Sequence, residues 1–324
     1  MLTRVAVLRG GPSVEHDSSL KTGMRVLREL EQHKSDTYHA LDIFIDRAGV
    51  WHVRGVPTTP ERALLHADVV WNALHGSYGE DGEVQRILDR VGVPYTGSGA
   101  YASSVGMNKA TAKAIVHASG VKTPKARTLS VSETLPRDIV YLFRELLLPV
   151  VIKPAGSGSS LGVTLARSFA QFEEGIKRAF SYSPQVLLEE FIEGKEATCG
   201  VVEHLRDTPL YSLPPIEIIV PKSVGIFTPD LKEDASDCSA CPGSFTAREV
   251  AELRSAAEVV HRNLGLRHYS RSDFIVSSRG VYFLEVNTLP GLSEQSLLPK
   301  ALSTVGVPFS EFVPHVIDLA RGKR

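Results

Sequence analysis

Lys153-Pro154-Ala155-Gly156-Ser157-Gly158-Ser159-Ser160-Leu161-Gly162 is the stretch around which the rest of the chain is organised. It follows an apolar run at 147–152 and leads into 163–165, which predicts a strand, a hairpin loop of small residues and a second strand. Glycine and serine let a backbone approach an anion closely, so the loop N–H groups can bind phosphate oxygens while Lys153 adds a positive charge. A flexible hairpin with a solvated lysine is also compatible with this stretch.

Composition narrows the class of protein. The chain has 324 residues, of which 43% are hydrophobic and 23% charged, and its 36 Lys and Arg against 37 Asp and Glu give a net charge of −1. A length of this size predicts two or three domains, and the balanced charge gives no reason to expect nucleic acid or a membrane surface as a partner. The apolar stretch at residues 1–8 is too short for the core of a signal peptide. No apolar run approaches the length of about 18 residues that a membrane-spanning helix requires. We therefore expect a cytoplasmic protein.

The number of cysteines also fits a cytoplasmic protein. Cys199, Cys238 and Cys241 are too few for a disulfide framework, which fits a reducing compartment. Cys238 and Cys241 have C-x-x-C spacing, but no second pair accompanies them, so zinc or redox use is not the favoured interpretation.

The N-terminal part has the pattern of an α/β unit. An apolar strand at 4–8 ends in a glycine turn and a helix is expected near Ser18, while a second buried strand at 69–74 leads into the glycine-rich loop 75–82. Ligands of such sheets bind beyond the carboxyl ends of the strands, so we expect the two loops to meet at one cleft. Glu15 lies in the first loop, where it is also compatible with a helix-dipole acid. His75 begins the second, where it is also compatible with a residue that holds the backbone.

The region after the second loop contains a glycine pattern that misleads. Residues 97–102 match G-x-G-x-x-A, but no proper strand precedes them and no acid follows at the usual distance, so a Rossmann dehydrogenase is discarded. Asn108 then predicts the N-cap of a helix through Lys109 and Lys113 that ends at Gly120. From its position alone, Lys109 on the first turn would be an exposed, solvated lysine.

The C-terminal part contains the residue types of a metal site. Residues 269–276 and 281–287 predict a β-hairpin across 278–280, and Glu285 and Asn287 share one face of its second strand. Together with Asp273 they offer hard oxygen ligands, which suit Mg²⁺ shared with phosphate oxygens. Solvated polar groups on a surface hairpin are the alternative. We favour the metal, because an acid flanked by apolar strand residues requires a partner.

Two further segments complete the organisation. Residues 185–196 predict a strand, a short turn and a second strand, along which a ligand can meet backbone polar groups, with Glu196 following. Residues 220–245 are rich in Pro, Gly, Ser and Asp and lack a clear period, which favours a mobile loop or lid.

With these motifs in this order, the chain resembles the D-alanine–D-alanine ligase family of ATP-grasp carboxylate–amine ligases. The matches are LRGGPSVE (8–15), HGSYGEDG (75–82), PYTGSG (94–99), MNK (107–109), KP (153–154) with GSSLG (158–162), RSD (271–273), and EVNTLPGL (285–292) with SL (296–297). The resemblance implies an α/β, three-domain ATP-grasp architecture. We expect an N-terminal α/β domain for the first substrate at 1–98 and a central domain with the phosphate loop at 99–190. A C-terminal domain at 191–324 would hold the metal site and the lid at 220–245, with ATP between the central and C-terminal domains.

The resemblance also implies a role for particular residues on the nucleotide side. ATP phosphates would be bound by Lys109, Lys153, Ser157, Gly158, Ser159 and Ser160. The adenine pocket would be lined by Glu189, Glu190, Phe191 and Ile192, with Glu196 toward the ribose. Two Mg²⁺ ions, replaceable by Mn²⁺, would be held by Asp273, Glu285 and Asn287.

On the amino-acid side, the implied catalytic residues are Glu15, Ser159, Arg271, Gly291 and Ser296. Glu15 would bind the ammonium of the first D-alanine, while Arg271 and the Gly291 N–H would stabilise the tetrahedral intermediate. Ser296 and Leu297 would hold the second carboxylate, and His75 and Lys232 belong to the same substrate site. The implied reaction joins two D-alanines through an acyl phosphate for peptidoglycan precursors.

The chain departs from the family in the lid. Relatives usually carry Lys-Tyr at the end of a tyrosine-rich stretch, whereas here Lys232 is followed by Glu233. This leaves open another second substrate, such as D-lactate, D-serine or a different amino acid. A nucleotide-binding regulator without catalysis is the alternative from another class. A homodimer is the usual state of the family and is expected here.

Overall fold

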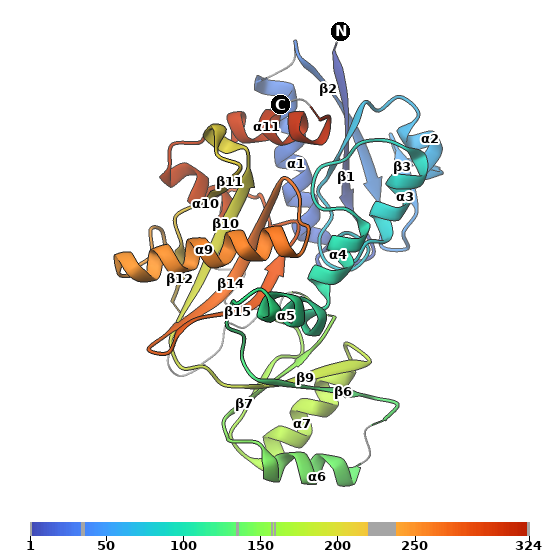
Figure 1. The fold of residues 1–324 in the computed structure, drawn as a ribbon. Coiled ribbons are helices and arrows are strands. Elements are labelled where there is room, and N and C mark those ends of the chain that lie inside the picture. The colour runs from blue at the N-terminus through green and yellow to red at the C-terminus, as the bar shows by residue number, and fades with distance from the viewer. Residues whose placement is uncertain are drawn as a thin grey trace.

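The computed structural model describes residues 2–33, 36–133, 136–156, 158, 160–219 and 238–322. Within these residues the strands form three sheets. Figure 1 shows them along one axis, with both termini at the upper end and the third sheet in a lobe of its own at the lower end. Among the helices in this part of the chain, none is both long and apolar enough to cross a membrane.

The first sheet has the order β4-β3-β2-β1-β5. Its strands are β1 (Thr3–Gly10), β2 (Tyr38–Ile45), β3 (Trp51–Val53), β4 (Val56–Thr58) and β5 (Val69–Asn72). β1 runs parallel to β2 and to β5, so the loops after β1 and β5 leave the same edge of the sheet. The accompanying helices are α1 (His16–His33), α2 (Pro60–Leu64) and α3 (Glu83–Val91). The expected α/β unit is confirmed, with α1 beginning at His16 rather than near Ser18.

The second sheet has the order β13-β12-β10-β14-β15, and β11 also pairs with β10. Its strands are β10 (Lys195–Glu203), β11 (Leu210–Ser212), β12 (Ile216–Ile218), β13 (Ser239–Ala240), β14 (Tyr269–Ser277) and β15 (Gly280–Asn287). A short 3₁₀ helix, η1 (Leu205–Asp207), links β10 to β11. The helices around this sheet are α4 (Ala100–Met107), α5 (Lys109–Ala118), α9 (Ala247–Asn263) and α10 (Leu297–Thr304), whereas α11 (Phe309–Ala320) packs against α1 and β5. The predicted hairpin of β14 and β15 is confirmed as an antiparallel pair.

The third sheet has the order β6-β9-β7-β8. Its strands are β6 (Ala126–Ser130), β7 (Val150–Pro154), β8 (Thr164–Ala166) and β9 (Gln185–Glu190), and α6 (Pro136–Glu145) and α7 (Phe169–Phe180) accompany it. β7 and β8 pair antiparallel on either side of the loop that follows Lys153, as the strand–loop–strand pattern predicts.

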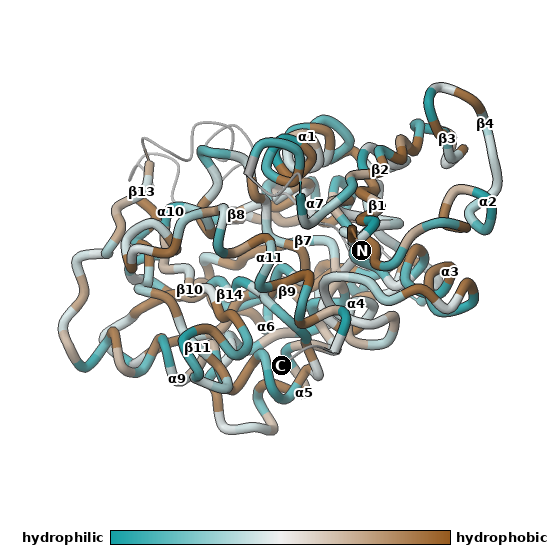
Figure 2. Tube along the Cα trace, turned by 90° about the horizontal axis from the view of Figure 1, so that it is seen from above, coloured by the Kyte–Doolittle hydropathy of each residue, from teal (hydrophilic) through white to brown (hydrophobic). Residues whose placement is uncertain are grey.

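The hydrophobic cores separate the third sheet from the other two. One core joins the first and second sheets, and in it Trp71 of β5 stacks on Tyr269 of β14 with ring centroids 6.4 Å apart. The core under the third sheet is built from residues 129–188 alone. Figure 2 shows α1 with alternating teal and brown turns, as expected of a helix with one buried face. The lobe at the third sheet therefore has its own core, while the first and second sheets have one core in common.

Candidate active site

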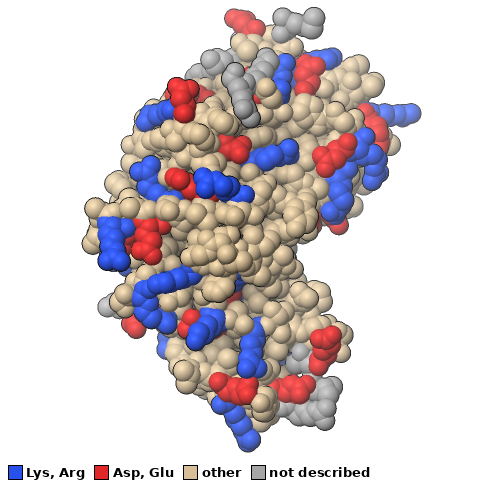
Figure 3. Space-filling view, viewed as in Figure 1, with Lys and Arg blue, Asp and Glu red and all other residues tan. Residues whose placement is uncertain are grey.

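A cavity of about 860 Å³ lies between the second and third sheets. Its volume is in the range of a small-molecule or cofactor site. On the face drawn in Figure 3, the surface is hollowed at the waist above the lower lobe, and Lys, Arg, Asp and Glu are interspersed over that face. The expected site residues that line the cavity are Lys109, Lys153, Ser160, Glu189, Glu190, Phe191, Ile192, Glu196, Arg271, Asp273, Glu285 and Leu297. Residues from many parts of the sequence thus meet at one site.

Part of the cavity wall is apolar. Ile192 is buried in the link between β9 and β10 and belongs to a small cluster with Ile275 and Tyr282, against which Leu284 packs. Val151 of β7 also lines the cavity. A flat apolar ring system fits such a wall, with backbone groups of the link available for hydrogen bonds.

Two buried lysines share one carboxylate on the side of the third sheet. Glu189 of β9 lies 3.0 Å from Lys153 Nζ of β7 and 2.8 Å from Lys113 Nζ of α5. Burial alone would raise the pKa of Glu189, but the two lysines outweigh it and the pKa is lowered. Burial lowers the pKa of Lys113 to about 7, while Glu189 opposes that shift. The cluster has two amino groups and one carboxylate, so with Lys113 protonated it carries one net positive charge, which would favour a phosphate.

Lys109 corrects the expectation of a solvated first-turn lysine. It is only 7% exposed, and its Nζ lies 2.9 Å from Glu285 Oε2 of β15. Its backbone N–H donates to Ala155 O at the end of β7, at 2.9 Å. The expected N-cap is confirmed, because the Asn108 side chain accepts from Thr111 N. The predicted place of Lys109 in the first turn of the helix is confirmed. It is buried because Glu285, from a distant part of the chain, pairs with it.

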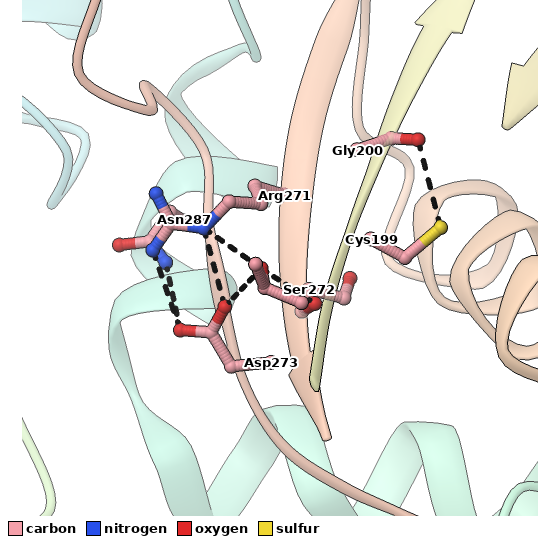
Figure 4. Close-up of polar contacts among 7 residues, drawn as sticks. Cys199, Gly200, Arg271, Ser272, Asp273 and Asn287 are labelled. Atoms are coloured by element: carbon pink, nitrogen blue, oxygen red, sulfur yellow. Dashed lines mark hydrogen bonds and ion pairs between the residues drawn. The ribbon is translucent and has the colours of Figure 1, made fainter. Parts of the chain in front are cut away.

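Carboxylate and amide oxygens gather on the side of the second sheet (Figure 4). Asp273 pairs with Glu285 in the register of β14 and β15, and Asn287 Nδ2 lies 3.3 Å from Asp273 Oδ2. Arg271 Nε donates to Asp273 Oδ1 at 3.2 Å. Burial alone would lower the pKa of Arg271, but Asp273 outweighs it and the pKa is raised. The guanidinium is therefore a permanent cation beside the expected metal ligands.

The donor set suits a hard divalent cation. It consists of two carboxylates and one side-chain amide, which are the ligands that Mg²⁺ prefers. Within the described parts of the chain, no group of three or more His, Cys, Asp and Glu residues gathers as a metal site. Any ion held here therefore depends on the Asn287 amide, on water or on substrate oxygens beside the two carboxylates.

The two N-terminal loops meet where the parallel strands predict. A Cβ added to Gly76 would lie 2.5 Å from Glu15 Oε2, and one added to Gly158 would lie 3.3 Å from the same atom. Gly76 also has φ +69°, a conformation that side chains rarely adopt. The loops after β1 and β5 thus meet at one carboxylate, which confirms their expected convergence, and Gly158 of the loop after β7 approaches it as well.

His75 uses both ring nitrogens within the fold. Nδ1 lies 3.0 Å from Leu289 O, and Nε2 lies 2.9 Å from Thr22 Oγ1. Since a carbonyl only accepts, Nδ1 carries the proton and Nε2 accepts from the threonine hydroxyl. The pKa of the ring is lowered, mainly by burial. This geometry favours the interpretation that His75 holds the backbone of the cleft.

Gly291 and Ser296 lie against each other after β15. A Cβ on Gly291 would lie 2.9 Å from Ser296 Oγ, and that hydroxyl is 2.8 Å from Ser293 Oγ. Ser296 is the N-cap residue of α10, whose first residue Leu297 reaches the cavity. The segment expected to hold an amino-acid carboxylate therefore opens toward the same space as the nucleotide residues.

The sequence matches known proteins along its length. Residues 116–318 match the family described as D-ala D-ala ligase C-terminus, and residues 54–98 match D-ala D-ala ligase N-terminus. The chain belongs to the D-alanine–D-alanine ligase family. A family member from Geobacter sulfurreducens is 36% identical over 99% of this chain and 95% of its own length, and one from Geotalea uraniireducens is 35% identical over 98% and 95%.

Solved structures confirm the α/β ATP-grasp fold of the family. D-alanyl-alanine synthetase A from Vibrio cholerae has a TM-score of 0.83 and 27% identity, and 98% of each chain is covered. The D-Ala:D-Ser ligase VanG from Enterococcus faecalis has a TM-score of 0.82 and 25% identity, over 99% of this chain and all of its own. The division at 98 and 190 stays a prediction.

Some predicted ligase residues cannot be placed. Ser157, Ser159, Lys232 and most of the expected lid lie outside the described residues; Cys238 to Phe245 at its end are described and include β13. Glu190 and Glu196 line the cavity, and Glu190 Oε1 also accepts from Lys125 N at 3.0 Å.

Three residues of this ligase site were not singled out from the sequence. Lys113 follows Lys109 by one helical turn, which was a usable signal, since such residues share a face. Glu80 is buried within the quoted 75–82 loop and accepts from Gly76 N and Leu289 N, both at 2.9 Å. Its pKa is raised to about 7 by burial and by Glu15. Thr198 lies on β10 opposite Asp273 and lines the cavity.

Proposed function

We propose that this protein uses ATP to join two D-alanine molecules into D-alanyl-D-alanine, a precursor of peptidoglycan. The observation that carries the proposal is the cavity between the second and third sheets. Cations on one side and oxygen ligands on the other meet there, in a chain that belongs to the D-alanine–D-alanine ligase family along its length. The family is ATP-dependent and generally uses divalent metals.

The first half-reaction converts a poor acyl donor into a good one. A carboxylate takes the γ-phosphoryl group of ATP and becomes an acyl phosphate. For this transfer the protein mainly has to position the reactants and neutralise the negative charge on the phosphoryl group. We assign Lys109 and Lys153 to the ATP phosphates. Asp273, Glu285 and Asn287 would hold two Mg²⁺ ions, which supply Lewis-acid neutralisation of the transferred group. Gly158 and Ser160 would present loop N–H groups to the phosphates, together with Ser157 and Ser159.

The second half-reaction requires a charge clamp and an oxyanion site. Glu15 would bind the ammonium of the first D-alanine, in the cleft where Gly76 and Gly158 lie against its carboxylate. The amine of the second amino acid attacks the acyl phosphate, and Arg271 with the Gly291 N–H would stabilise the oxyanion. Ser296 and Leu297 would hold the second carboxylate. Water must be excluded, because it would hydrolyse the acyl phosphate.

A ligase with another acceptor is a second candidate. Two observations favour keeping it: Glu233 stands where relatives usually have tyrosine, and a structural neighbour is titled as a D-Ala:D-Ser ligase. The chemistry and the ATP site would be the same, and only the second amino acid or hydroxy acid would differ.

The decisive experiment measures phosphate release from ATP upon addition of D-alanine, with the product identified by mass spectrometry. We expect D-alanyl-D-alanine in stoichiometric amounts with phosphate. Parallel reactions with D-alanine plus D-serine or D-lactate test the second candidate. Binding of ATP without turnover for any acceptor would instead support the catalytically silent regulator.

We also propose a homodimer, because that is the usual state of the family. Sedimentation at several protein concentrations tests it, and a mass of one chain throughout would reject it.

A further inference from the structure

Thr198 lies between two charged groups of the candidate active site. It is on β10, directly opposite Asp273 in the register with β14, and is 2% exposed. Its hydroxyl donates to Asp273 Oδ1 at 2.6 Å and accepts from Arg271 Nε at 2.9 Å. Ser272 O, at 3.2 Å, is the weaker of the two acceptors within its reach. Thr198 also lines the cavity.

The direct contact between Arg271 and Asp273 is long. Nε lies 3.2 Å from Oδ1, and the terminal nitrogen lies 3.4 Å from Oδ2. A charge-assisted pair of this kind normally closes to about 2.7–2.9 Å. The hydroxyl takes the short contacts on both sides instead, so it separates the two ions while satisfying one hydrogen-bonding site on each.

This separation matters for both residues. Both carboxylate oxygens of Asp273 already face the guanidinium, at 3.2 and 3.4 Å, and closure of this pair to a shorter distance would leave them less available to a metal. Arg271 would likewise present fewer N–H groups to a developing oxyanion. Figure 4 shows Arg271, Asp273 and Asn287 grouped together, the first two from within β14 and the third from the end of β15. A small fixed group between the ions keeps each of them oriented for a different task.

We propose that Thr198 is a positioning residue, whose hydroxyl holds Asp273 and Arg271 in the arrangement required for metal binding and oxyanion stabilisation. The proposal rests on the roles proposed above for those two residues. Thr198 itself acts through them and does not need to touch a substrate.

The chain offers a matched pair of variants. Thr198→Val keeps the shape and removes the hydroxyl, whereas Thr198→Ser keeps the hydroxyl. We expect kcat for dipeptide formation to fall about 10- to 100-fold in Thr198→Val, with the KM for D-alanine within about twofold of wild type. Thr198→Ser should retain turnover within about threefold of wild type. A structural role alone would not separate the two variants in this way.

A second readout does not depend on activity. We would titrate Mn²⁺ into the protein with ADP present and follow free Mn²⁺ by electron paramagnetic resonance. The half-saturating Mn²⁺ concentration should rise about tenfold in Thr198→Val and stay near wild type in Thr198→Ser. Equal behaviour of wild type and Thr198→Val in both assays would overturn the proposal, as would equal impairment of Val and Ser.

The outcome is separable from that of the proposed function. If wild type makes no dipeptide from D-alanine, the proposed function fails, and the Mn²⁺ titration still decides on Thr198. If wild type is active and Thr198→Val matches it, only the Thr198 proposal fails. Thermal unfolding of each variant checks folding. Should Thr198→Val not fold, Thr198→Ala against Thr198→Ser provides the same test, with loss of Mn²⁺ affinity expected in Ala alone.

Discussion

The two sides of the cavity solve opposite electrostatic problems. On the third sheet, the cations Lys113 and Lys153 share the carboxylate of Glu189, and all three side chains are almost entirely buried. On the second sheet, Asp273 and Asn287 surround Arg271, and Arg271 and Asp273 remain partly exposed. One side has spare positive charge and the other has spare oxygen atoms.

The difference shows which side depends more on the fold for its stability. A buried ion is stable only with a fixed partner, so Glu189 of the third sheet, Lys153 beside it and Lys113 of α5 are held together as part of the folded structure. The pair of Arg271 and Asp273 has long contacts and access to the cavity, so each group can interact with a ligand from the place where it is held. We infer that the lysine side contributes strongly to folding as well as to the site, whereas the arginine side contributes mainly to chemistry.

The largest effect is expected from Glu189→Gln. The change keeps the shape and one acceptor but removes the carboxylate that both Lys113 and Lys153 contact directly. Breaking a buried pair costs about 3–5 kcal/mol, so the free energy of unfolding measured with urea should fall by that order. The control is Glu173→Gln, which removes an exposed pair with Lys177 on α7 and should change stability by no measurable amount. Similar losses in both variants would mean that burial does not distinguish the lysine cluster.

The next effect concerns turnover. Arg271→Ala should lower kcat by at least about 10²-fold, because a preorganised oxyanion donor is lost. Stability should change much less than in Glu189→Gln if the arginine side mainly serves chemistry. Arg262→Ala, at an exposed position of α9, is the matched control and should stay near wild type. Near-normal turnover of Arg271→Ala would remove Arg271 from the mechanism.

The smallest effect is a pH dependence of stability. Lys113 has a pKa of about 7 when folded, lowered by burial, against about 10.4 in an unfolded chain. Above pH 7 the unfolded chain therefore holds a proton that the folded chain has lost, and stability rises with pH. Between about pH 7 and pH 8, the free energy of unfolding of wild type should rise by about 1 kcal/mol relative to Lys113→Met. Parallel pH profiles of the two proteins would indicate that Lys113 stays charged in the fold.

The sequence predicted those features that local patterns encode. The β14–β15 hairpin and the strand–loop–strand at Lys153 follow from periodicity and glycine-rich turns. The meeting of the Glu15 and His75 loops follows from parallel strands, whose ends share an edge. The identity of the site residues came from motif resemblance to the family, and their roles stay predictions.

Other features depend on contacts between distant residues and have no local signal. Lys109 was expected in solvent, because nothing near it in sequence indicates Glu285. Thr198 meets Asp273 from 75 residues away, through strand register alone. Threonine is common in strands because of its high β propensity, so its presence at position 198 did not indicate a role in hydrogen bonding to charged groups.

The spacing of two lysines on α5 limits insertions and deletions in this helix. Lys109 reaches Glu285 in the second sheet, while Lys113, one turn later on the same face, reaches Glu189 in the third. A residue inserted between them would rotate the second lysine by about 100° around the helix and away from its partner. Loops elsewhere can lengthen or shorten over generations, but this turn can accept substitutions only. In a scan of single-residue deletions through α5, we therefore expect deletions at 110–112 to be tolerated least.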